Sequence, residues 1–185
     1  MSKRLLNREL LPGNDCFGCG HDNPRGLQIE VTDGEEEREG LAGRFVPPTH
    51  STGFPGITHG GALFTAMDCL ATWVVALQGP QDDRYWLLES SDVSYRKAAP
   101  EGEPLRLAGR LAEREFDDGR ERLQVHVEIR DEDGDLVSEG KFREVPVTAE
   151  KLRLLSGIEE IPDAWRSLFE RGGSGGGRDD PGAPG

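Results

Sequence analysis

Hydrophobic and polar positions divide this chain into one long apolar segment and several shorter stretches in which the two kinds alternate. The apolar segment covers residues 60–77, and its only ionisable carboxylate is Asp68. Its length and nearly unbroken apolar character predict a buried helix. Gly79 and Pro80 should end that helix, because glycine takes the left-handed cap conformation and proline cannot continue the hydrogen-bond ladder. We therefore expect one central, buried helix.

Alternating stretches predict β-strands before and after this segment. The alternation at 27–33 leads through Asp-Gly, a typical hairpin turn, to a second candidate strand at 38–46. Further strands are expected at 85–97, 105–116, 120–130 and 135–145. Alternation with a period of two is typical of an antiparallel sheet with one solvated face. The pattern therefore predicts an α+β fold with the helix inside and the sheet outside.

Three segments flank the main domain, which we place at residues 27–146. Residues 1–26 form an N-terminal extension that contains a Cys-x-x-Cys turn, and its four leucines trace a short amphipathic pattern that we expect to pack loosely. Residues 147–171 carry weaker signals for two helices. The glycine-rich composition of residues 172–185 cannot bury a core, so we expect a disordered tail there.

The overall charge excludes some classes of partner. The formal net charge is −13, from 22 Lys and Arg against 35 Asp and Glu, which argues against nucleic-acid or anionic-membrane partners. Residues 60–77 have about the minimum length of a membrane span, roughly 18 residues, but Asp68 lies near the middle and no basic flank borders them. A buried core helix is the better interpretation. The N-terminal residues contain no apolar run long enough for a signal peptide, so we expect a cytoplasmic protein.

The cysteines suggest a metal site without completing one. The chain has three cysteines, too few and too scattered for a disulfide framework. Cys16 and Cys19 have the Cys-x-x-Cys spacing of zinc ligands, but zinc takes four ligands and His21 would supply only a third. We therefore expect a tightly packed turn with no metal and no other cofactor, and we keep a zinc site as an alternative.

The start of the apolar segment could stabilise a negative charge. A helix N-terminus carries unpaired N–H groups and a partial positive charge, and Gly60 and Gly61 would expose those groups to the oxygen of a bound carbonyl. Asp68 would be the base or nucleophile, with the Thr72 hydroxyl donating a hydrogen bond to its carboxylate. About 12 Å of helix axis separates His59 from Asp68, so a second subunit is needed to bring them to one site. Alternatively, His59 is a helix cap and Asp68 a buried structural acid.

At this point the sequence resembles a known family. Residues 58–68 read Thr-His-Gly-Gly-Ala-Leu-Phe-Thr-Ala-Met-Asp and resemble the His-Gly-Gly-x6-Asp signature of PaaI-type hotdog-fold acyl-CoA thioesterases. The resemblance covers roughly residues 16–146, including a Cys-x-x-Cys-Gly-x-x-Asn-Pro-x-Gly-Leu opening and the strand 92–97. It implies a hotdog fold, in which a curved antiparallel sheet of about six strands wraps the helix. It also implies a homodimer or dimer of dimers with its sites at the subunit interface.

The resemblance assigns roles to individual residues. The Gly60 N–H would polarise the thioester carbonyl, His59 would shape that pocket, and Asp68 of the partner subunit would act as general base or nucleophile. Thr72 matches a supporting hydroxyl. The CoA end of the substrate would run along the sheet edge, where positive charge could meet phosphate. The expected substrate-binding positions are Gly61, Ser91, Arg96 and Lys97.

Two positions depart from the family pattern. Gly53 stands where many members have Asn or Gln, and Leu88 where many have Ser or Thr. Water would then have to be positioned by other groups, such as His50 or Ser51. We therefore expect hydrolysis of acyl-CoA thioesters, with a non-catalytic acyl-CoA-binding module as the alternative. A hotdog dehydratase would need a differently arranged His and acid pair.

Overall fold

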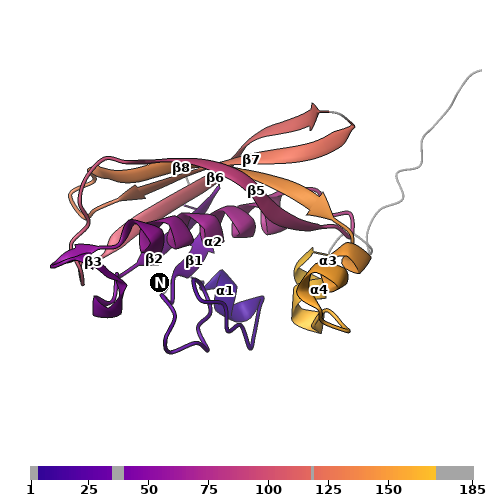
Figure 1. The fold of residues 1–185 in the computed structure, drawn as a ribbon, viewed down its shortest axis with the longest axis horizontal. Helices are drawn as coiled ribbons and strands as arrows, with labels where there is room; N and C mark the ends of the chain where they lie inside the picture. The colour runs from indigo at the N-terminus through magenta and orange to yellow at the C-terminus, as the bar shows by residue number, and fades with distance from the viewer. Residues whose placement is uncertain (1–3, 35–39, 118, 170–185) are drawn as a thin grey trace, which may run out of the picture.

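The computed structural model describes residues 4–34, 40–117 and 119–169. Its centre is α2 (Gly60–Gln78), which the sheet covers along one side (Figure 1). Side chains on most of the helix circumference are buried, from Ala62 to Ala76. Among the described helices, α2 alone is long and apolar enough to cross a membrane, and 61% of that window is buried. A core helix meets the same criterion, so α2 fits the predicted central helix. The helix ends at Gly79 as predicted, but the expected left-handed conformation is wrong, because Gly79 is extended with φ of −75°.

One six-stranded antiparallel sheet curves around α2. Its strands follow the order β1 (Glu30–Asp33), β2 (Leu41–Phe45), β6 (Leu105–Asp117), β7 (Arg120–Arg130), β8 (Leu136–Val147) and β5 (Tyr85–Tyr95). Alternate side chains of β7, from Leu123 to Ile129, are completely buried, because successive residues of a strand point to opposite faces. The predicted strands, and the α+β fold, are thus confirmed within a few residues.

A small hairpin delivers the chain to α2. The 3-10 helix η1 (Thr49–Ser51) leads into β3 (Thr52–Phe54), which pairs with β4 (Ile57–Thr58) in a separate two-stranded sheet. The His59 N–H donates to the Ser51 carbonyl at 2.7 Å, which fixes the chain just before the helix begins. The start of α2 is therefore held in place by backbone pairing.

The N-terminal segment packs tightly, so the expected loose packing is wrong. It lies on the side of α2 away from the long strands and contains α1 (Leu6–Glu9) (Figure 1). The buried Asn7 amide donates to the carbonyls of Cys19 at 2.8 Å and Ile29 at 3.0 Å, and its oxygen accepts the Val31 N–H at 3.1 Å. One asparagine side chain thus joins the first helix to the cysteine turn and to β1, and satisfies three backbone groups that burial would otherwise leave unpaired.

The C-terminal helices form as predicted and close one end of the molecule. They are α3 (Ala149–Ser156), which Thr148 caps by accepting the Lys151 N–H at 3.2 Å, and α4 (Asp163–Phe169). Phe169 is buried, and its ring centroid lies 5.2 Å from that of Tyr85 at the start of β5. The end of α4 therefore joins the same core as α2, and α3 packs against that core through partly buried side chains. The predicted disordered tail at 172–185 lies outside the described residues.

Candidate functional site

The start of α2 presents one backbone N–H that no described residue accepts. His59 is the N-cap, and its Nδ1 accepts the Gly61 N–H at 2.8 Å, so the predicted alternative of a capping role is confirmed. The Ala62 N–H is bonded to the His59 carbonyl at 2.9 Å. The Gly60 N–H is left over within the described ranges, at the positive end of the helix dipole. Gly60, rather than Gly61, is therefore the group able to hold an oxyanion.

The backbone around Gly53 leaves no room for a side chain at this position. A Cβ added to Gly53 would lie 2.8 Å from the Cα of His59, closer than real side chains approach backbone. The β3–β4 hairpin therefore packs directly on the helix cap. A longer side chain here, such as the Asn or Gln expected from the family pattern, would push the hairpin away from His59.

Asp68 lies in the middle of α2, where it lines a cavity of about 570 Å³. Apolar side chains from several elements share the lining, among them Leu88 of β5, Leu152 of α3 and Trp165 of α4. Burial raises the pKa of the Asp68 carboxyl, and the neighbouring Cys16 raises it further. The contribution of the C-terminal helices was not predicted, because their weak amphipathic patterns do not indicate where they pack.

Thr72 lines the same cavity but does not support the Asp68 carboxylate. Its hydroxyl donates to the backbone carbonyl of Asp68 at 3.2 Å. Threonine inside a helix often bonds the carbonyl four residues earlier in this way, which leaves the hydroxyl no second proton to donate. The predicted hydrogen bond from Thr72 to the carboxylate is therefore wrong, although the residue is next to the site.

A second carboxyl group, missed in the sequence, lies close to Asp68. Glu144 of β8 is 0% exposed, and both its oxygens lack a hydrogen-bond partner in the described structure. Burial, with a contribution from the Asp68 charge, raises the pKa of Glu144 to about 8. Burial therefore favours the neutral form of this carboxyl group. Its position two residues after the buried Phe142 was the available signal, since both point to the same face of the strand.

The end of β5 lies next to the start of α2. The Tyr95 hydroxyl donates to the Gly60 carbonyl at 3.0 Å. Arg96 follows and pairs with Glu139 at 2.9 Å, whereas Lys97 pairs with Asp131 at 2.6 Å and with Asp135 at 2.8 Å. Asp131 and then Asp135 raise the pKa of Lys97.

Both cations therefore have acidic partners within the chain. Ser91 is exposed on β5, several residues before them.

The predicted residues thus form two groups on one helix. The first comprises His59, Gly60 and Gly61 at the start of α2, next to the end of β5. The second is Asp68 with Thr72, which lies about 12 Å further along the helix axis at 1.5 Å per residue. Within one chain the structure does not bring the two groups together.

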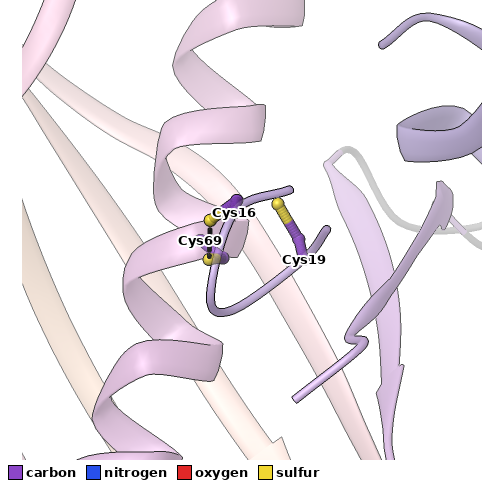
Figure 2. Close-up of side chains that lie close together, drawn as sticks. All are labelled: Cys16, Cys19 and Cys69. Carbon is purple, nitrogen blue, oxygen red and sulfur yellow. Dashed lines mark hydrogen bonds between the residues drawn. The ribbon is translucent and has the colours of Figure 1, made fainter. Parts of the chain in front are cut away.

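The cysteines form a third group, with a member that the sequence did not indicate. The predicted tight turn is present, because the Gly20 N–H donates to the Cys16 carbonyl at 3.0 Å. The turn lies against α2, and the sulfur atoms of Cys16, Cys19 and Cys69 are all within 4.8 Å of one another (Figure 2). The third member of the group is therefore Cys69 of α2, next to Asp68, and not His21.

Comparison with known families gives no functional description. A family model described as a domain of unknown function, DUF4442, matches residues 55–145, which include α2 and the strands β5 to β8. No curated protein matches the chain.

Solved structures share the fold. A thioesterase superfamily protein is 21% identical with a TM-score of 0.61, covering 78% of this chain and 68% of its own. A Streptococcus mutans protein solved with acetyl-CoA is 18% identical with a TM-score of 0.53, covering 65% of this chain and 89% of its own. PaaI from the phenylacetic acid degradation operon of E. coli is 12% identical with a TM-score of 0.53, covering 65% and 80%. The predicted hotdog fold is therefore confirmed, and at these identities the likeness extends to the fold alone.

Proposed function

We propose that this protein hydrolyses acyl-CoA thioesters to a free acid and CoA. The observation that carries the proposal is the arrangement along α2. The Gly60 N–H at the positive helix end has no acceptor among the described residues, and Asp68 lines an apolar cavity further along. The first group suits the developing oxyanion of a thioester, and the second suits activation of water beside an acyl group. Neither group alone would indicate hydrolysis.

In this mechanism the Asp68 carboxylate takes a proton from water as the water oxygen bonds to the thioester carbonyl carbon. The carbonyl oxygen becomes an oxyanion that accepts the Gly60 N–H, and His59 holds that turn of backbone in place through its bond to Gly61. Collapse of the tetrahedral intermediate breaks the carbon–sulfur bond. The CoA thiolate leaves and receives the proton that Asp68 took, so that the products are the free acid and CoA.

The two groups act on one substrate in a homodimer. Gly60 and Asp68 of one helix are about 12 Å apart along its axis, too far for a single carbonyl. Strand β5 lies at the edge of the six-stranded sheet, and within the described residues its outer side pairs with no strand. Pairing of β5 with its copy would place two α2 helices side by side about a two-fold axis. CoA would then extend along β5 from Ser91 towards Arg96 and Lys97, which follow the end of the strand.

The test is CoA release from a panel of acyl-CoA substrates, followed with a thiol reagent. Asp68→Asn should lower kcat by about 10²–10⁴-fold, the usual contribution of a positioned base. Asp133→Asn, in the exposed turn between β7 and β8, is the matched control and should leave kcat unchanged. Absence of CoA release from every acyl chain, or full activity of Asp68→Asn, would contradict the mechanism.

A second candidate is a module that binds acyl-CoA without hydrolysing it. The packing of Gly53 against His59 favours this candidate, because it leaves no side chain at position 53 to orient water. Titration calorimetry with acyl-CoA separates the two functions. Saturable binding without CoA release supports the binding module, whereas turnover supports hydrolysis.

A further inference from the structure

The cysteine group has the geometry of a metal site, and we propose that Cys16, Cys19 and Cys69 bind one zinc ion that fastens the N-terminal segment to α2. The three sulfur atoms lie within 4.8 Å of one another, and those of Cys16 and Cys69 are 4.0 Å apart. Zinc–thiolate bonds of about 2.3 Å in a tetrahedron separate two sulfurs by about 3.8 Å. A small closing of the group would therefore produce this geometry.

The backbone around the group brings the sulfurs together. A Cβ added to Gly18 would lie 2.3 Å from the Cys69 sulfur, so only glycine lets the turn approach the helix this closely. Figure 2 shows the turn crossing α2, with Cys16 directed at Cys69 and Cys19 beside them. Cys16 and Cys69, which are 53 positions apart in the sequence, are thus brought together by the close packing of the turn on α2. A turn with only a structural role does not require such close packing.

Two buried donors point at the sulfur atom of Cys19. The Trp73 indole Nε1–H donates to the Cys19 sulfur at 3.4 Å, and the Asn14 side-chain amide donates to the same atom at 3.6 Å. Both residues are 3% exposed. N–H donors stabilise a thiolate more than a thiol, and such surrounding groups tune metal-bound cysteines. This environment suits thiolate ligands, whose charge a cation would balance.

The donor set selects the metal and leaves one position open. Three thiolates without a histidine or carboxylate among them favour a soft or borderline ion such as Zn²⁺ over Mg²⁺ or Ca²⁺. All three cysteines line the cavity that also contains Asp68. The fourth coordination position therefore faces that cavity, where water or a carboxylate can occupy it. The proposal does not depend on the hydrolytic function, because a bound ion would stabilise the fold whether or not the protein is an enzyme.

The test is metal content and cobalt spectroscopy of the full-length protein, purified under reducing conditions. About one zinc per chain is expected, and Co²⁺ in its place should show sulfur-to-cobalt charge transfer with tetrahedral d–d bands. Cys16→Ser and Cys19→Ser should lower the metal content to about a tenth or less. His21→Gln is the matched control, since it changes a possible ligand next to the turn, and it should retain the metal.

A second measurement does not depend on how the variants fold. Removing zinc from the unaltered protein with a chelator should speed proteolysis within the N-terminal segment, and adding Zn²⁺ should restore protection. The proposal is overturned by a metal-free protein with three thiols and no cobalt charge-transfer band. It is also overturned by a Cys16–Cys69 disulfide in place of the metal, or by loss of the metal in His21→Gln but not in the cysteine variants.

Discussion

Replacing Gly60 with proline would remove one backbone N–H from the start of α2 and change little else. Gly60 is the first helical residue after the His59 cap, the position where proline is best tolerated. His59 has ψ of 133°, within the extended range that a residue before proline requires. The N–H that proline lacks has no acceptor among the described residues, so its loss breaks no hydrogen bond within them.

The expected effect is therefore on catalysis and not on folding. Loss of one oxyanion donor costs about 10²–10³-fold in kcat, or about 3–4 kcal/mol of transition-state stabilisation. KM should change little, because the donor acts mainly on the charge that develops in the transition state. Steady-state CoA release measures both constants, and thermal unfolding measures stability.

Gly60→Ala is the matched control. Alanine keeps the N–H, and its Cβ would lie 3.4 Å from the Tyr95 ring, which is an ordinary contact. We expect its kcat within about 3-fold of the unaltered protein, since no transition-state contact is lost. A folded Gly60→Pro variant with full kcat would refute the role of this N–H.

Three further substitutions test the surroundings of the site. Thr72→Val should change kcat by less than about 3-fold in CoA-release assays, because the hydroxyl bonds the helix backbone and not the carboxylate; a loss of 10²-fold would contradict this. Gly53→Asn should lower stability in urea by about 1–3 kcal/mol through its collision with His59, and should not raise activity; an unchanged urea midpoint would show that the hairpin adapts. Glu144 has a folded-state pKa of about 8, raised by burial and by Asp68 on α2, whereas its β-strand neighbours Leu88 and Leu123 are uncharged. Because a carboxyl with a raised folded pKa favours folding in its neutral form, its contribution is fully present below the unfolded pKa and is lost as pH rises through about 8. Glu144→Gln should therefore match the unaltered protein near pH 5 and exceed it by roughly 3–5 kcal/mol above pH 8; parallel pH profiles in urea unfolding would contradict the assignment.

The regular elements could be predicted because each depends on local pattern. The alternation of Leu123, Val125, Val127 and Ile129 gave β7 with both ends correct, since residues of one strand face share one environment. The apolar segment gave α2 in the same way. The tight packing of the N-terminal segment was not predictable, because it depends on the Asn7 amide meeting backbone groups more than ten residues away.

In the candidate site, too, residues within one sequence motif could be predicted, whereas residues that meet through tertiary packing could not. Gly60 and Asp68 could be identified because they lie within one short motif, residues 59–68. Cys69 could not be joined to Cys16, since only the packing of the N-terminal turn on α2 brings them together. Glu144 was missed because nothing local to β8 indicates that Asp68 lies opposite it. Residues that meet through tertiary packing need the structure to be recognised.

In the proposed mechanism, Gly60 of one subunit and Asp68 of its partner act on the same thioester. Co-expression of Gly60→Pro and Asp68→Asn chains with different affinity tags would allow the mixed dimer to be purified. Each variant alone should be almost inactive, whereas the mixed dimer contains one intact site out of two and should recover about half of the unaltered kcat. A mixed dimer as inactive as its parents would contradict the account, because residues acting within one subunit cannot complement each other.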